Sequence, residues 1–265
     1  MFVIAALTMN FPVIATLVTS LKSDAEIGSN PSLWVKAPTL QNYSAIFAMA
    51  DRFDITHFLL NSIVASLLGT ALALLLGFPA SYAMVRYGVG RAWLQPLIAN
   101  LRAIPLIIFA IPIYFMYQQL SLLDTRTGLA LILCLVNLPL VIVLLTTAIA
   151  ELPLEIEEAA RIDGANTRRL LLHVVAPMLT NAMAASAVLA FIYSWNEFLF
   201  GLILTTNRAV PISVGASFFF AASGGGVRWG IASAVMMLAT LPPLLLGLTM
   251  YGWIGRSMSA GAVKG

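Results

Sequence analysis

The sequence is poor in charged residues and in cysteine. Only 9% of its 265 residues are Asp, Glu, Lys or Arg, against roughly 25% in a typical soluble domain. Hydrophobic residues make up 60% of the chain. This composition excludes an ordinary soluble enzyme and predicts a membrane protein that crosses the bilayer several times. The single cysteine, Cys134, excludes a disulfide framework and a cysteine-based metal site.

The sequence also lacks the phosphate-binding pattern G-x-x-x-x-G-K-[ST], and none of its three lysines (Lys22, Lys36 and Lys264) follows a glycine. The chain therefore has no such loop to hold ATP, and no cofactor is expected on it. Its net charge is +3, but the basic residues are scattered and no basic stripe alternates with aromatic residues. Nucleic acid is therefore not an expected partner.

Six uncharged stretches are each long enough to cross the hydrocarbon core as a helix, which takes about 20 residues. They predict an all-α polytopic membrane protein with one transmembrane domain, residues 1–265. The six predicted transmembrane helices cover approximately residues 1–21, 58–84, 93–118, 128–149, 178–204 and 229–254.

With six spans, both termini lie on the same side of the membrane, together with residues 86–92 and 150–173. Seven basic residues fall on that side and six on the other. On the second side, Lys36 and Arg52 lie in a long loop, where distance from the span ends weakens the positive-inside rule. The distribution favours a multi-pass protein with both termini and the 150–173 segment in the cytoplasm.

The most polar passage lies between the fourth and fifth spans, where Glu151–His173 holds eight of the 25 charged residues. Pro153 suits the first turn of a helix and Gly164 its C-terminal stop, while Asn166 or Thr167 can cap a second short helix that runs to Pro177. Two alanines at the centre of the first helix leave room for another protein to approach its backbone. Residues 150–177 are therefore predicted to form a docking loop, with a solvated helix pair as the alternative.

The spacing of this loop resembles a known family. Glu158-Ala159-Ala160, then Gly164, Val174 and Pro177, is similar to the EAA loop of ABC importer permeases. The sequence DGAN at 163–166 is similar to the version in sugar importers of the maltose type. Other segments resemble the family in the family's order: LQNY at 40–43, LLNSIVAS at 59–66, SLLDTRTGL at 121–129, SWNEFLFGLILT at 194–205 and SAGAVKG at 259–265. The likeness is to the second, smaller, G-type permease.

The resemblance implies a subunit of a binding-protein-dependent, ATP-driven sugar importer in the bacterial cytoplasmic (inner) membrane. The implied partners are a homologous second permease, two copies of a cytoplasmic ATPase that carries ATP and magnesium, and an extracytoplasmic sugar-binding protein. The chain itself is then not an enzyme. Its coupling helix transmits closure of the ATPase dimer to the pore as alternating access, and the terminal segment 259–265 reaches into the ATPase interface. The implied ATPase-coupling residues are Glu158, Ala159, Ala160, Arg161, Asp163, Gly164 and Ala165.

A sugar pathway requires aromatic faces beside hydrogen-bonding groups. Five residues meet this description and form the candidate substrate pathway: Asn61, Tyr193, Trp195, Asn196 and Glu197. The alternative is structural, because aromatic residues anchor helices at the membrane interface and amides link helices inside a bundle. The sequence does not identify the saccharide or glycoside.

Two other functions would use some of these residues. A secondary, ion-coupled transporter commonly carries ionisable residues within its spans; here only Arg102 and Glu197 qualify, and about 10–15 Å separates their depths. An intramembrane protease of the E-E-x-x-x-R type is the other alternative. Glu157-Glu158 and Arg161 form E-E-x-x-R, which is one residue short.

Overall fold

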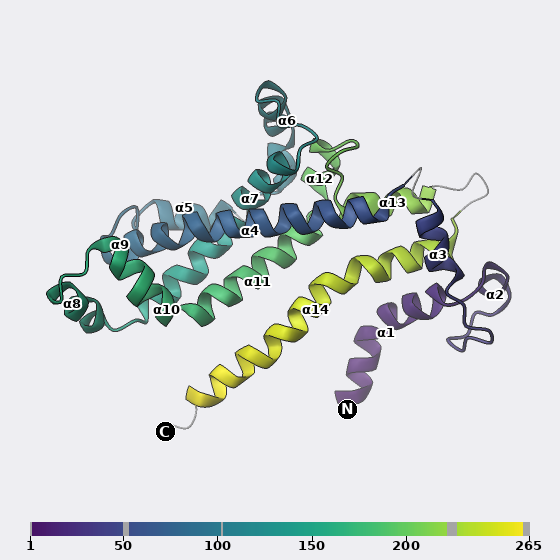
Figure 1. The fold of residues 1–265 in the computed structure, drawn as a ribbon, viewed down its shortest axis with the longest axis horizontal. Helices are drawn as coiled ribbons and strands as arrows, with labels where there is room; N and C mark the ends of the chain where they lie inside the picture. The colour runs from purple at the N-terminus through teal and green to yellow at the C-terminus, as the bar shows by residue number, and fades with distance from the viewer. Residues whose placement is uncertain (1, 50–52, 102, 222–226, 262–265) are drawn as a thin grey trace. The chain divides into compact units, whose positions relative to one another are not determined.

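The computed structural model describes residues 2–49, 53–101, 103–221 and 227–261 (Figure 1). Every regular element in these ranges is a helix. The elements are α1 (Phe2–Ser20), α2 (Asp24–Ser29), α3 (Gln41–Ala48), α4 (Ile55–Arg86), α5 (Leu94–Leu101), η1 (Leu106–Phe109), α6 (Ala110–Gln119), α7 (Arg126–Ala150), α8 (Leu154–Ile162), α9 (Thr167–Leu170), η2 (Leu171–Val175), α10 (Ala176–Met178), α11 (Thr180–Asn196), α12 (Leu199–Leu204), α13 (Ile212–Ala221) and α14 (Trp229–Gly261).

Three of the described helices are long and apolar enough to cross a membrane: α4, α7 and α14. A fourth candidate is a broken one, in which Thr167–Met178 and Thr180–Asn196 meet at an angle of 80°. The all-helical membrane fold is thereby confirmed, and the count of six spans stays a prediction. Arg102, one of the two ionisable residues expected within the spans, lies outside the described residues. So do residues 262–265 of the terminal segment that is expected to reach the ATPase.

Two predicted spans are not single helices. The 93–118 stretch is divided into α5, η1 and α6, with the break before Pro105. A proline lacks the backbone N–H of a helix and disfavours a helical residue before it. The 178–204 stretch is divided into α11 and α12 because Glu197 is extended, with φ −66° and ψ 120°. Its carboxylate accepts hydrogen bonds from the N–H groups of Phe200 (3.0 Å) and Gly201 (3.2 Å), which stabilises the start of α12.

The chain divides into two compact units. The first contains residues 1–63 and 209–244, and the second contains residues 64–208 and 245–265. Because α4 and α14 continue from one range into the other, the single transmembrane domain stays a prediction. Residues 150–177, the predicted docking loop, belong wholly to the second unit.

In the first unit, buried polar side chains hold the connection between α1 and α3. The amide of Asn42 donates to the carbonyls of Ser20 (2.9 Å) and Lys22 (2.7 Å). The carboxylate of Glu26 accepts from the backbone N–H of Lys36 at 2.7 Å. This hydrogen bond is the largest cause of a lowered pKa of Glu26, and it outweighs the opposing effect of removing the carboxylate from water. Apart from the short helix α2, the connection is therefore ordered by hydrogen bonds from its side chains.

In the second unit, α4 and α7 approach closely at two glycines. A Cβ atom on Gly69 would lie 2.8 Å from Leu133 Cβ, and one on Gly77 would lie 2.7 Å from a methyl carbon of Val141. Small residues allow such close packing of helices in a membrane, where apolar burial alone provides little driving force. On another side of α7, the Asn137 amide donates to the Ser194 hydroxyl of α11 at 2.9 Å.

A clasp around Asp124 joins two loops of the second unit. The Asp124 carboxylate accepts from the backbone N–H groups of Thr206 (3.1 Å), Asn207 (3.2 Å) and Arg208 (2.9 Å). Its own N–H donates to the carbonyl of Leu204 at 2.8 Å. Ser121 and Asp124 have φ of 55° and 54°, in the left-handed region that non-glycine residues seldom adopt. The hydrogen bonds of the clasp hold the unfavourable backbone of Asp124 in place.

We expect Gly69→Ala to destabilise the protein by about 1–3 kcal/mol relative to Gly247→Ala, because the new methyl group overfills the α4–α7 contact. Gly247 lies inside α14 with nothing within 4 Å of an added Cβ. Both substitutions replace glycine by alanine inside a helix, so the gain in helix propensity is the same in each and cancels when the two variants are compared. Thermal unfolding in detergent measures both, and equal melting temperatures would contradict the prediction.

Candidate functional site

The predicted docking loop has the helix–glycine–helix structure that its sequence indicated. Helix α8 follows Pro153 and carries acidic residues in its first turn and Arg161 in its last, which suits the helix dipole. Gly164 then adopts φ +85°. The N–H of Ala165 donates to the carbonyl of Ala160 at 2.9 Å, as in a glycine-terminated helix. These local predictions are confirmed.

The second helical segment is less regular than predicted. Asn166 caps it, since its side-chain oxygen accepts the N–H of Arg169 at 2.9 Å. After the single turn of α9, however, Leu171–Val175 forms a π-helical turn, and the short α10 ends at Met178 before the 80° bend into α11. Single π turns within helices are uncommon and are frequent at functional sites. No sequence pattern indicated this turn.

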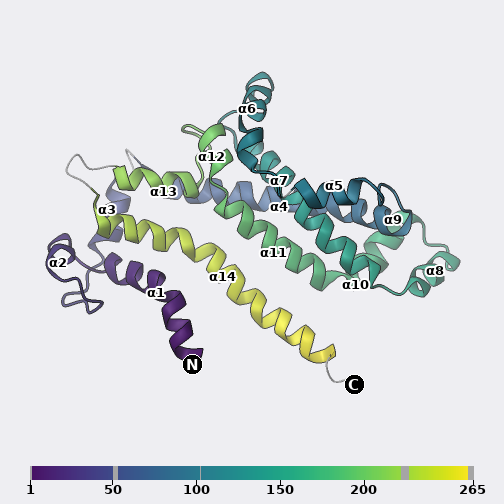
Figure 2. The same ribbon diagram turned by 180° about the vertical axis from the view of Figure 1, so that it is seen from behind.

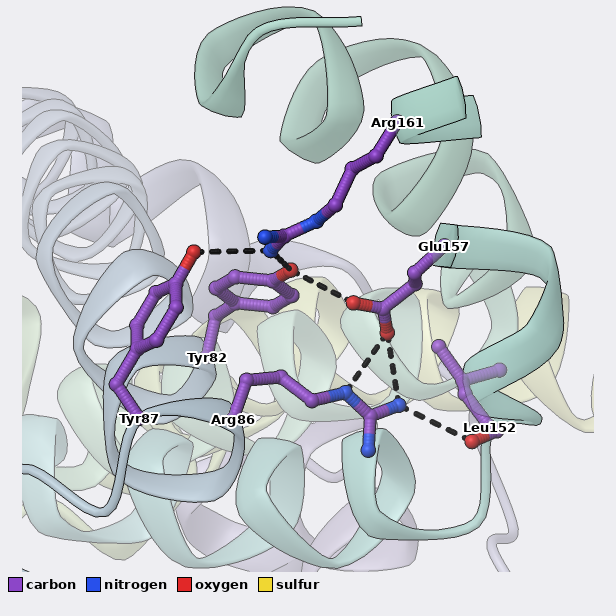
Figure 3. A network of polar contacts seen from close by, with 6 residues as sticks. All are labelled: Tyr82, Arg86, Tyr87, Leu152, Glu157 and Arg161. Atoms are coloured by element: carbon purple, nitrogen blue, oxygen red, sulfur yellow. Dashed lines mark hydrogen bonds and ion pairs between the residues drawn. The ribbon is translucent and has the colours of Figure 1, made fainter. Parts of the chain in front are cut away.

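Helix α8 is anchored to the Arg86 end of α4 by an ion pair (Figure 3). The Glu157 carboxylate, 2% exposed as a residue, accepts from Arg86 Nε at 2.8 Å and lies 2.8 Å from Arg86 Nη2. Its other oxygen accepts from the Tyr82 hydroxyl at 2.6 Å. Arg86 also donates to the carbonyl of Leu152 at 3.0 Å. We call Tyr82, Arg86 and Glu157 the α8 anchor.

Arg161 adds a second connection one helical turn beyond Glu157. Its Nη2 donates to the Tyr87 hydroxyl at 3.0 Å and to the Tyr82 hydroxyl at 3.4 Å (Figure 3). The guanidinium carbon lies 5.9 Å from the centre of the Tyr87 ring, within the range of a cation–π contact. The hydrogen bonds to Tyr82 and then to Tyr87 raise the pKa of Arg161. The side chain therefore stays charged and faces α4.

The opposite face of α8 is open. Glu158 and Ala159 are exposed, and Ile162 is 86% exposed. Glu155, Glu158, Ala159 and Ile162 lie on one side of the helix because residues three and four apart are neighbours on its surface. We call these four residues the outer face of α8. A helix fixed on one side, with an exposed isoleucine one turn after a glutamate on the other, is suited to bind another protein.

The seven predicted coupling residues divide between these two faces. Glu158, Ala159, Asp163 and Gly164 are exposed, whereas Ala160 and Ala165 are partly buried and Ala160 packs against the core. Arg161 contacts the tyrosines. Sequence reasoning missed Glu157 and Ile162. The helical repeat could have revealed them, because it places Glu157 and Arg161 on one face and Glu158 and Ile162 on another.

The predicted pathway residues have different surroundings. The Asn61 amide is buried in the first unit and donates to the carbonyl of Val210 at 2.9 Å. In the second unit, Trp195 is buried and stacks on Phe191, while Tyr193 is 52% exposed. Asn196 is also exposed, and its amide donates to the carbonyl of Ile192 at 2.8 Å. Glu197 accepts backbone N–H groups at the start of α12. Only Tyr193 and Asn196 present exposed side chains, one turn apart on α11.

The sequence matches the family described as "Binding-protein-dependent transport system inner membrane component" over residues 69–260. The sulfoquinovosyl glycerol transport system permease protein SmoH of Agrobacterium fabrum is 32% identical over 258 residues, which cover 96% of this chain and 89% of that protein. The trehalose/maltose transport system permease protein MalG of Thermococcus litoralis is 29% identical over 267 residues, which cover 99% of this chain and 94% of that protein.

Solved structures with the same fold are also transporters. A bacterial ABC transporter involved in the import of the acidic polysaccharide alginate aligns with a TM-score of 0.79 and 21% identity, over 95% of this chain and 93% of that chain. The MetNI methionine ABC transporter in an inward-facing conformation aligns with a TM-score of 0.56 and 18% identity, over 80% of this chain and 97% of that chain. At these identities the likeness establishes the fold alone.

Proposed function

Because this chain belongs to the family of binding-protein-dependent transport system inner membrane components, the permeases of ABC transporters, we propose that it is the G-type permease of a bacterial sugar importer. Similar relatives carry names that refer to sugars or sugar conjugates, among them SmoH, MalG and the trehalose permease SugB of Mycobacterium tuberculosis. The chain forms one half of a translocation pore, and the cargo is a saccharide or glycoside.

The proposed assembly contains four other polypeptides. A homologous second permease completes the pore, two copies of a cytoplasmic ATPase bind ATP and magnesium, and an extracytoplasmic binding protein delivers the sugar. The chain crosses the inner membrane six times with both termini in the cytoplasm. Nucleotide on one side and loaded binding protein on the other shift the equilibrium between inward-open and outward-open states.

The observation that carries this proposal is the outer face of α8. Ile162 is exposed beside Glu158 and Ala159, and the α8 anchor fixes the helix on the other side. An exposed apolar side chain on a rigid, polar-rimmed helix is typical of a protein-binding surface. We assign the ATPase as its partner and residues 158–165 as the coupling segment.

For the sugar pathway, the proposal narrows to Tyr193 and Asn196. They share one exposed face of α11, and together they offer an aromatic ring and an amide. Asn61 and Trp195 are buried and Glu197 is partly buried, and their contacts within the protein suit a role in holding the helices.

Reconstitution in liposomes tests the proposal. With its second permease, ATPase and binding protein, the chain should support ATP-driven uptake of radiolabelled maltose or trehalose, whereas alone it should neither hydrolyse ATP nor take up sugar down a proton or sodium gradient. In the same vesicles, an Ala165→Cys, Cys134→Ser chain should react with a membrane-impermeant maleimide only from the cytoplasmic side. Gradient-driven uptake by the chain alone would favour a secondary transporter, and labelling from outside would reverse the topology.

A further inference from the structure

We propose that the movement of the coupling helix enters the permease through α4, and that Tyr82 and Arg86 are the positioning residues that transmit it. This inference rests on the proposed function, because it assumes that an ATPase moves α8. It adds a direction: α8 and the adjoining part of α4 move as one body, and α11 follows through a jointed connection.

The α8 anchor satisfies the requirements of a rigid connection. Both oxygens of Glu157 are engaged, one by Arg86 and the other by Tyr82. The side chains of Arg86 and Glu157 are only 13% and 3% exposed, so water competes little with the ion pair. Pulling the two apart would leave a buried charge without its partner, which is strongly unfavourable. A displacement of α8 therefore takes Arg86 with it.

The anchor, together with the contacts of Leu152 and Arg161, also resists rotation of α8. Arg86 binds the carbonyl of Leu152 before the helix begins, and Glu157 within it. One turn further along, Arg161 contacts Tyr82 and Tyr87. Contacts at three successive levels, all from the Arg86 end of α4 and the residue after it, fix both the position and the rotation of α8 (Figure 3).

The chain between α8 and α11 is not one continuous helix. It passes through Gly164 at φ +85°, the single turn of α9, the π-helical turn and the three residues of α10, and then bends by 80°. Each interruption breaks the regular i to i−4 hydrogen bonding that makes a helix rigid. The views from both sides show α8 and α9 beside the Arg86 end of α4, with α10 leading into α11 (Figures 1 and 2).

Pulsed electron paramagnetic resonance on the assembled complex tests this inference. Nitroxide labels replace Ile156 on α8 together with either Leu75 on α4 or Leu189 on α11, in a Cys134→Ser background; all three are exposed apolar residues. Distances are compared without nucleotide and after trapping with ATP and vanadate. We expect the α8–α4 distance to stay constant and the α8–α11 distance to change by more than about 2 Å, the size of helix shifts in such transitions.

Substitutions in the anchor should reverse this pattern. With Arg86→Gln, and to a smaller degree with Tyr82→Phe, the α8–α4 distance should itself become nucleotide-dependent. Arg91→Gln is the matched control, because this exposed arginine follows α4 without belonging to the anchor. Since the ring of Tyr82 is kept in Tyr82→Phe, this variant decides the matter if Arg86→Gln does not fold.

Two outcomes would overturn the inference: an α8–α4 distance that changes in the unsubstituted protein as much as the α8–α11 distance, or anchor variants whose α8–α4 distance stays constant. An assembled complex in which neither distance changes overturns it as well. Failure of the ATPase to copurify with the unsubstituted permease is a different result, because it refutes the proposed function on which the inference rests.

Discussion

A Gly164→Pro permease is expected to reduce sugar-stimulated ATP hydrolysis of the assembled transporter to the basal rate of the ATPase. Gly164 has φ +85°, whereas proline fixes φ near −65°. Proline also removes the N–H that donates to the carbonyl of Arg161 at 3.0 Å. The turn after α8 cannot form, so the outer face of α8 is displaced from its partner. ATP hydrolysis in proteoliposomes, normalised to permease, measures the effect.

Gly164→Asn is the matched control for this change. Asparagine tolerates the left-handed region better than other non-glycine residues, at a cost of about 1–2 kcal/mol or less. Stimulated hydrolysis should therefore be largely retained, with permease abundance in the membrane similar for both variants. Normal stimulation in Gly164→Pro would show that this segment does not couple the ATPase.

Ile162→Arg should lower the amount of ATPase that copurifies with the permease by at least about tenfold. Burial of an isoleucine side chain contributes about 1.5–3 kcal/mol, and each 1.4 kcal/mol corresponds to a factor of about ten in binding. A charged residue in the same position adds the cost of removing that charge from water. ATPase retained per permease after detergent extraction is the measurement.

Val89→Arg provides the comparison for Ile162→Arg. Val89 is an exposed apolar residue in the loop after α4, and it lies outside the outer face of α8. The same substitution there should leave ATPase retention within about twofold, less than 0.5 kcal/mol, as is usual for a surface change away from an interface. Equal losses in both variants would mean that added charge, and not the docking position, is responsible.

The parts of the site that depend on neighbouring residues could be predicted from the sequence. Gly164 as a helix stop and Asn166 as a cap follow from local backbone chemistry, and both were confirmed. For Glu157, the helical repeat indicates a shared face with Arg161 but not the residue that it binds. Its partner Arg86 lies 71 residues earlier in the chain, and no local pattern specifies that contact. Composition indicated that charge was concentrated in the loop, but not which carboxylate was buried.

The same distinction applies to the predicted spans and pathway. Hydropathy located the apolar stretches because lipid compatibility is a local property, but it did not predict that two of them are divided. Pro105 was a visible signal for one division; the other depends on Glu197 accepting backbone N–H groups of α12. Asn61 was assigned to the pathway for its amide chemistry. Its carbonyl partner, Val210, is 149 residues away and could not be found from spacing.

The Asp124 clasp has a consequence for when this part of the protein can fold during synthesis. Its partners at Thr206, Asn207 and Arg208 lie 82–84 residues later in the chain. All the helices from α7 through α12 must therefore be synthesised before the clasp can close. Closing so long a segment carries an entropic cost that local contacts do not. Until then, the left-handed backbone at Asp124 lacks the hydrogen bonds to residues 204–208 that hold it. This region of the second unit therefore reaches its native form only after synthesis has passed residue 208.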